Sequence, residues 1–417
     1  MSHSLSKCLA SCALTALVSG ACTGDPETLV SGPEFEQTQA RIRVLTPAPI
    51  RVLASLPYER ALTRPDVAEQ NLNGQVRVAE QLPAARSRLL DLYGLRIGMF
   101  GQFSDLALGM EFAESQTLTA PMNSEMWVQR ASAEASVHRF SDALVSLDRA
   151  EALGADTSDP KDMLSLALRP ATAELATRLC RAAEARPTYQ THTACASAQA
   201  SMGRYALADD HYGFALDGYA DVSPFPVAWV QFQRGVMWGE MADNQEVARR
   251  LYEDAVRILP GYVVANVHLA ELEFEAGEFD LASARLERVA EREDPEPLSR
   301  LAQFLAEQPA PDMVRSAEAQ AEALSRWNAV LDGERAAYLD HGAEFFMAAG
   351  DDAERGLSLA LENLENRQTE RALLLALDAA LHAGSQTLAC ELLRSVPGEP
   401  KRVALAELVG ALTPQCG

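Results

Sequence analysis

Hydrophobic and polar positions follow one recurring arrangement along most of this chain of 417 residues. In four stretches of six residues, the third residue is aromatic and the sixth is small or apolar. A large residue then comes four positions later and a small one seven later, as in Ala143, Leu147 and Ala150. This spacing places apolar side chains on one face of a helix. The four ungapped stretches are 101–106, 138–143, 203–208 and 277–282.

Equivalent positions return at a nearly constant interval. They fall at about 106, 143, 176, 208, 248, 282, 317, 355 and 389, so eight steps cover 283 residues (389 minus 106), a mean near 35. The units near 176 and 317 are degenerate, and the unit at 248 carries about one extra residue. The pattern resembles the tetratricopeptide repeat (TPR), a helix pair of about 34 residues. Over residues 86–412, this resemblance implies an all-α fold, a TPR-type right-handed α-solenoid of about nine antiparallel helix pairs with a concave groove.

The residue types in the pattern have a physical reason. Ala143, Ala208 and Ala282 are small enough for two helices to approach closely where they cross. Glycines that end the first helix of a pair are expected to adopt a positive φ; they are Gly203, Gly277, Gly350 and Gly384. Because one pair cannot bury its own apolar face, neighbouring pairs must stack. An unrelated alanine-rich helical bundle is the alternative.

The amino terminus has the pattern of an export signal. Lys7 precedes an apolar run over 8–18, which is too short to span a bilayer and suits a signal peptide over 1–21. The residues before Cys22 resemble a bacterial lipobox, although Ser19 stands where that family usually has Leu. The resemblance implies lipidation of Cys22, and Thr23 after it implies outer-membrane sorting. Cleavage by an ordinary signal peptidase, giving a soluble secreted or periplasmic protein, is the alternative.

The remaining regions outside the repeats are short. Residues 22–40 are polar with proline and glycine and predict a flexible tether. Residues 41–85 form a non-repeat segment, and 413–417 a tail. Export also bears on the four cysteines that follow Cys22, because an oxidising compartment favours pairing. Cys180 and Cys195 flank a turn nearly symmetrically and are candidates for a disulfide or for two buried thiols; Cys390 with Cys416 is the weaker pair.

Charge excludes some partners. The chain has 59 acidic residues against 36 Lys and Arg, a net charge of −23, so we expect no nucleic acid and contact with a membrane only through the lipid anchor. No catalytic or nucleotide-binding motif with good spacing occurs, and we expect no cofactor. His268 with Glu271, and His341 with Glu344, could each present two ligands to a metal. A metal site would need a second pair facing them, so no metal is expected.

The TPR resemblance also implies which residues line the groove, namely positions on the first helix of each unit. These are chiefly the second, fifth, ninth and twelfth positions of that helix. At the ninth position three units carry an acidic residue: Glu271, Glu344 and Asp378. The Lys and Arg residues that clamp a carboxylate in chaperone-binding TPRs are absent. The candidate groove residues are Val267, Glu271, Phe274, Asp340, Glu344, Met347, Leu374 and Asp378. They predict a groove for a basic or amphipathic protein segment; alternatively, the carboxylates only keep an exposed face soluble.

These observations favour a non-catalytic scaffold over an enzyme. The resemblance implies a protein–protein interaction adaptor in the bacterial cell envelope, with a protein or peptide partner bound in the groove. The alternative is a module that binds a peptide, glycan or peptidoglycan fragment as an accessory to an enzyme.

Overall fold

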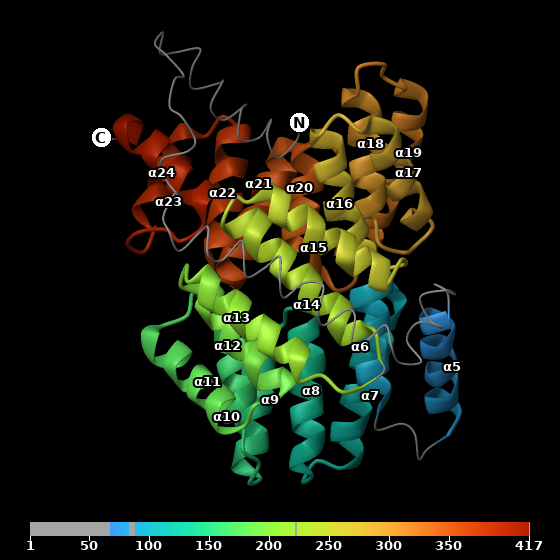
Figure 1. The fold of residues 1–417 in the computed structure, drawn as a ribbon, viewed down its shortest axis with the longest axis vertical. Coiled ribbons are helices and arrows are strands. Elements are labelled where there is room, and N and C mark those ends of the chain that lie inside the picture. Colours follow the sequence, from blue (N-terminus) through green and yellow to red (C-terminus); the bar gives the residue numbers. More distant parts are fainter. Residues whose placement is uncertain (1–66, 83–87, 222, 417) are drawn as a thin grey trace. The chain divides into compact units, whose positions relative to one another are not determined.

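The computed structural model describes residues 67–82, 88–221 and 223–416. These residues form twenty α-helices, one π-helical and one 3₁₀ turn, and no strand (Figure 1). The all-α prediction is therefore confirmed for this part of the chain. None of these helices is both long and apolar enough to cross a bilayer. The predicted signal peptide, Cys22 and the tether lie outside the described residues.

The helices belong to two compact units, each assembled from separate stretches of chain. Among the described residues, the second unit comprises 67–169 and 259–379, and the first comprises 170–258 and 380–416. Described helices of the second unit are α5 (Val67–Gln81), α6 (Leu89–Phe100), α7 (Ser104–Thr119), α8 (Ser124–Ser136), α9 (Phe140–Ala152), α10 (Ser158–Leu168), α16 (Val263–Glu275), α17 (Phe279–Val289), α18 (Glu296–Glu307), α19 (Met313–Asp332), η4 (Arg335–Tyr338), α20 (Leu339–Met347) and α21 (Ala353–Asn366). Those of the first are α11 (Ala173–Ala185), α12 (Tyr189–Ser201), α13 (Tyr205–Asp217), α14 (Phe225–Val236), η3 (Met237–Met241), α15 (Gln245–Ile258), α23 (Gln386–Arg394) and α24 (Val403–Cys416). The chain crosses from one unit to the other after residue 169, after residue 258 and within α22 (Glu370–His382).

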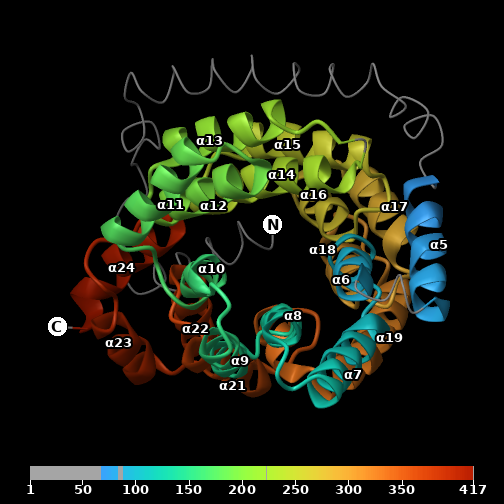
Figure 2. The same ribbon diagram turned by 90° about the horizontal axis from the view of Figure 1, so that it is seen from below.

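The small residues of the repeat pattern lie where helices cross. Ala143 in α9, Ala208 in α13 and Ala282 in α17 have no exposed surface. Each belongs to a helix that packs against the one before it, and the neighbouring α11, α12 and α13 can be followed side by side in Figure 2. Close packing of short alanine side chains explains how a chain with only 6% aromatic residues builds its core.

The turn glycines behave as predicted at three of four positions. Gly203, Gly277 and Gly384 have φ of 73°, 81° and 70°. Gly350 was expected to do the same, but the positive φ (48°) falls on Asp351 instead. Gly350 serves a different purpose, because a Cβ there would lie 2.9 Å from Cα of Phe346. This glycine is needed for a close backbone approach and not for its torsion angle.

The extra residue of the unit at 248 has a local explanation. The helix α14 ends in the π-helical turn η3, which accommodates one additional residue per turn. Two glycines allow close packing of this segment on α15. A Cβ on Gly235 would lie 2.4 Å from the Tyr252 ring, and one on Gly239 would lie 2.9 Å from Cβ of Ala248.

Contacts distant in sequence complete the second unit. Gln102 and the Ser104 backbone N–H both donate to Glu293, across about 190 residues of chain. The rings of Phe103 and Tyr338 lie 4.5 Å apart, and the Asn366 side chain donates to the carbonyl of His138 at 3.0 Å. The early repeats of this unit therefore pack on its later repeats, in addition to their sequence neighbours.

Candidate functional site

A network of buried charges joins the first helices of three successive repeats in the second unit. Arg300 of α18 lies between Glu271 of α16 and Glu344 of α20. Its Nε is 2.7 Å from Glu271 Oε1, and its terminal nitrogen is 3.0 Å from Glu344 Oε2. The Arg300 side chain is only 10% exposed. Burial alone would lower the pKa of Arg300, but the attractions of Glu271, Glu344 and Glu296 together outweigh it and raise the pKa.

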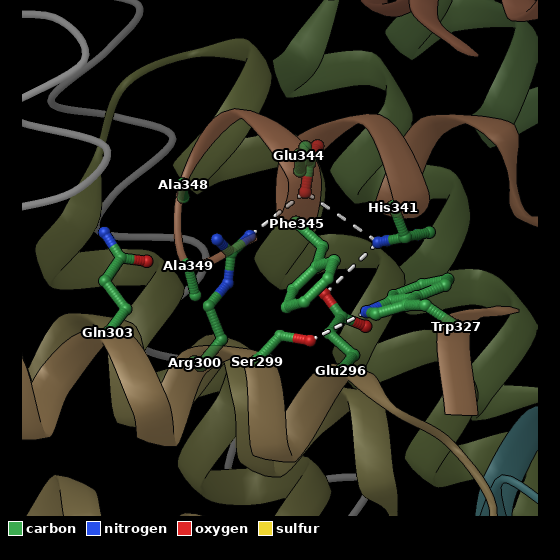
Figure 3. A pocket seen from close by; sticks show the side chains of 10 residues that line it. All are labelled: Glu296, Ser299, Arg300, Gln303, Trp327, His341, Glu344, Phe345, Ala348 and Ala349. Atoms are coloured by element: carbon green, nitrogen blue, oxygen red, sulfur yellow. Dashed lines mark hydrogen bonds and ion pairs between the residues drawn. The ribbon is translucent and has the colours of Figure 1, made fainter. Parts of the chain in front are cut away.

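His341 of α20 extends this network to the start of α18. Its Nδ1 is 3.2 Å from Glu296 and 3.9 Å from Glu344 (Figure 3). Burial lowers the pKa of His341, but Glu296 and Asp340 outweigh that effect and raise it to about 10. Burial conversely raises the pKa of Glu296, but His341 and Arg300 outweigh it and lower that pKa to about 2. His341 is therefore a cation at neutral pH and Glu296 is a carboxylate.

Asp340, one residue before His341, is also neutralised inside the unit. It pairs with Arg367 and lies 3.8 Å from Arg371. Burial works to raise the pKa of Asp340, but the positive charges of His341, Arg367 and Arg371 outweigh it and hold the pKa well below its usual range. Arg371 also approaches Glu344 at 3.4 Å. The acidic residues of α20 thus have arginine partners from within the chain.

A small cavity lies beside this network. Figure 3 shows Arg300 and Glu296 from one helix facing Glu344 and His341 from another, with Trp327 donating to Ser299 at 2.8 Å. The free volume is about 10 Å³, enough for about one water molecule. The cavity is therefore too small for an organic substrate, and the charged groups around it form ion pairs with one another.

The same side chains form a possible metal-binding set. Glu296, His341 and Glu344 place ligand atoms within 4.8 Å of one another, so a third ligand does reach the His341–Glu344 pair that the sequence suggested. A metal would have to displace the proton from His341 and compete with Arg300 at Glu344. Since these two cations already balance the carboxylates, the residues fit an internal ion network better than a metal site.

The predicted groove residues separate into three groups. Val267 and Phe274 belong to the hydrophobic core, 0% and 2% exposed, and so present no surface to a partner. Met347 packs against the same core beside Gly356. The acidic residues Glu271, Asp340 and Glu344 are engaged in the ion pairs described above.

Leu374 and Asp378 of α22 form the third group, because both remain partly exposed. Burial, followed by repulsion from Glu344, raises the pKa of Asp378 to about 7. The Asp378 carboxyl therefore lies close enough to Glu344 for the two negative charges to repel each other. These two residues, one helical turn apart, are what remains of the predicted binding surface.

Sequence reasoning missed the cation at the centre of the network. Arg300 lies in the degenerate unit near 317, where no motif marked the position of the first helix. The signal available was indirect: acidic residues recurring at one position of neighbouring repeats require neutralisation if that position is buried. The same applies to Arg234 in the first unit, which is 0% exposed and pairs with Asp209 at 2.8 Å.

Comparisons with known proteins agree with the repeat pattern. Residues 243–308 match the family model described as tetratricopeptide repeat. No curated protein sequence gives a significant match. Among solved structures, yeast Tom70 shares 14% identity, with a TM-score of 0.32 over 91% of this chain and 97% of that chain. Human IFIT1 shares 15%, with a TM-score of 0.42 and 86% of each chain covered. None of these values implies a shared activity or partner.

Proposed function

We propose that this protein is a non-catalytic scaffold of the bacterial cell envelope that binds a segment of another protein. Tetratricopeptide repeats generally mediate protein–protein interactions, and the TPR match supports this class of function. The observation that carries the proposal is the state of the buried charges: Arg300, His341 and Arg367 neutralise the acidic side chains from within. The cavity beside them holds about one water molecule, so this network leaves no room for an organic substrate.

We assign the partner to the surface around Leu374 and Asp378 on α22. An apolar and an acidic side chain one turn apart suit an amphipathic segment with a basic residue. Burial and the nearby negative charge of Glu344 raise the pKa of Asp378 to about 7. A Lys or Arg of the partner would offset this repulsion between the two carboxylates. Engagement of a cation should therefore favour the ionised form of Asp378.

The proposed localisation is based on the sequence of the amino terminus. Lipidation of Cys22 would anchor the chain at the outer membrane, with the polar residues 23–40 between the anchor and the repeats. Metabolic labelling with palmitate tests this directly: wild type should carry the label and Cys22→Ala should not. A labelled Cys22→Ala protein, or an unlabelled wild type released by an ordinary signal peptidase, would contradict the anchor.

Site-specific crosslinking in cells tests the scaffold role. A photoreactive amino acid replaces Leu374 in one strain and Glu365, an exposed residue of α21, in a control strain. We expect the Leu374 strain to give a discrete crosslinked protein by mass spectrometry, and the control not to give it. Asp378→Lys should abolish the Leu374 product. The assignment fails if both positions capture the same set of proteins or if Asp378→Lys leaves the product unchanged.

The second class of ligand predicts a different result. Isothermal titration of the purified protein with peptidoglycan fragments should show no heat for a protein-binding scaffold. Saturable heat that is lost in Asp378→Lys would identify a wall-fragment module at the same surface and replace the scaffold proposal.

A further inference from the structure

The first unit contains a cluster of sulfur and imidazole groups that the scaffold role does not use. Cys180 of α11 and Cys195 of α12 form a disulfide, with Cα atoms 4.7 Å apart. His211 of α13 lies against this disulfide. The ligand atoms of the three residues are all within 4.8 Å of one another. The cysteines come from α11 and α12 and the histidine from α13, three helices that lie side by side in Figure 2.

A second histidine, His192, contacts His211, although it is not one of the three residues whose ligand atoms all lie within 4.8 Å of one another. His192 lies three residues before Cys195 and so on the same face of α12. Its Nδ1 is 3.0 Å from Nδ1 of His211. Burial lowers the pKa of both imidazoles, and the charge of His192 lowers that of His211 further. Burial therefore favours the neutral form of both rings, which is the form in which histidine binds a metal.

The surroundings favour thiolates once the disulfide is open. The Gln199 side-chain amide donates to Cys180 Sγ at 3.1 Å, and such a donor stabilises a negative sulfur. Cys195 is fully buried, whereas His192 and His211 are partly exposed beside the exposed ring of Phe214. The cluster thus has a buried sulfur side and an open imidazole side through which an ion could enter.

We propose that reduction of the Cys180–Cys195 disulfide converts this cluster into a tetrahedral zinc site formed by Cys180, Cys195, His192 and His211. Two thiolates and two imidazoles are a ligand set typical of structural zinc. Zinc–sulfur and zinc–nitrogen bonds of about 2.3 and 2.0 Å place ligand atoms roughly 3–4 Å apart in a tetrahedron. The sulfurs have to separate from bonding distance, and side-chain rotation provides that movement.

The conversion balances with a dithiol as reductant. Thiol–disulfide exchange transfers two electrons and two protons from the dithiol to Cys180 and Cys195, and the dithiol leaves as its own disulfide. Binding of Zn²⁺ then releases two protons from the cysteine thiols, while the neutral imidazoles contribute lone pairs. The disulfide links α11 to α12 only, whereas zinc would link both helices to α13. The site does not depend on the proposed scaffold role.

The second disulfide supplies a matched control. Cys390 and Cys416 are also paired, but among the described residues no group of three potential ligands includes either of them. The double variant Cys390→Ser/Cys416→Ser should therefore bind zinc like the wild type after reduction. Any loss of binding in this control would mean that the wrong pair of cysteines has been assigned.

Cobalt spectroscopy and zinc competition on the full chain test the proposal. The protein is reduced with a phosphine, freed of reductant, and titrated with Co²⁺ and then Zn²⁺. We expect no binding before reduction. After reduction we expect one ion per chain, with the visible bands of tetrahedral cobalt and a sulfur-to-cobalt charge-transfer band. Removal of a direct ligand should weaken zinc by at least about a hundred-fold, the upper range for outer-shell partners.

The histidine variants keep the result interpretable if a cysteine variant misfolds. His211→Ala and His192→Ala retain the disulfide, so both can be purified oxidised and then reduced. Each should lose the tetrahedral spectrum. Wild-type affinity in His192→Ala would overturn the four-ligand assignment. A reduced wild type that keeps its helical circular dichroism without binding cobalt, or that unfolds and is not restored by zinc, would overturn the site itself.

Discussion

The ion network around Arg300 makes a quantitative prediction about stability. In Arg300→Met, a side chain of similar length replaces the guanidinium and leaves Glu271 and Glu344 without their shared cation. At about 3 Å and an effective dielectric constant of 20, each lost attraction amounts to roughly 5 kcal/mol before desolvation is considered. The Arg300 desolvation cost disappears in the variant and offsets much of that. Removing one member of a buried ion pair typically costs about 3–5 kcal/mol, and we expect this value.

Urea denaturation followed by circular dichroism measures the effect, with the midpoint and slope fitted together. Arg315→Met is the matched control, because Arg315 also pairs with a glutamate, Glu287, but is 50% exposed. That variant should change the free energy of unfolding by less than about 1 kcal/mol. The two variants differ mainly in burial, so their difference isolates the cost of an uncompensated buried charge.

A compensated variant provides the decisive comparison. Arg300→Met combined with Glu271→Gln and Glu344→Gln removes all three charges together and should recover most of the lost stability. The reasoning is refuted if Arg300→Met costs less than about 1 kcal/mol. It is refuted equally if the triple variant is no more stable than Arg300→Met, since that would show that packing and not charge determines the loss.

Three further predictions address other positions. Asp209→Ala should destabilise the protein by about 3–5 kcal/mol because Arg234 is left buried and unpaired, whereas the exposed Glu246→Ala should cost less than about 1 kcal/mol in the same urea assay. The pKa of His341 is raised to about 10, so its contribution to stability is complete below about 6.5 and is lost as the pH rises toward 10. His341→Gln should flatten the pH dependence of the unfolding free energy in that window, and equal slopes in wild type and variant would contradict the assignment. Gly350→Ala should cost about 1–3 kcal/mol through crowding against Phe346, whereas Gly98→Ala, where a Cβ meets nothing within 4 Å, should be neutral or stabilising in thermal unfolding.

Local pattern determined much of this fold in advance. Seven of the nine repeat positions, including the degenerate one at 317, fall within a helix that packs against the helix before it, whereas 176 lies in α11, which packs on the following helix α12. Periodicity could locate them because a small residue is required wherever two helices cross closely. The positive φ at Gly203, Gly277 and Gly384 could also be predicted from the sequence, because glycine adopts that conformation without steric cost.

Only the tertiary structure decided what the acidic residues do. The register identified Glu271, Glu344 and Asp378 as equivalent, but it could not show that Arg300 neutralises the first two and that Asp378 lies near Glu344 without such a pair. That outcome depends on which helices stack on which faces, as does the burial of Val267 and Phe274. The contact between His192 and His211, and the position of His211 beside the Cys180–Cys195 disulfide, could not be predicted from the sequence for the same reason. Helix periodicity is a local property of neighbouring residues, whereas charge compensation and ligand geometry depend on contacts between helices that the spacing does not encode.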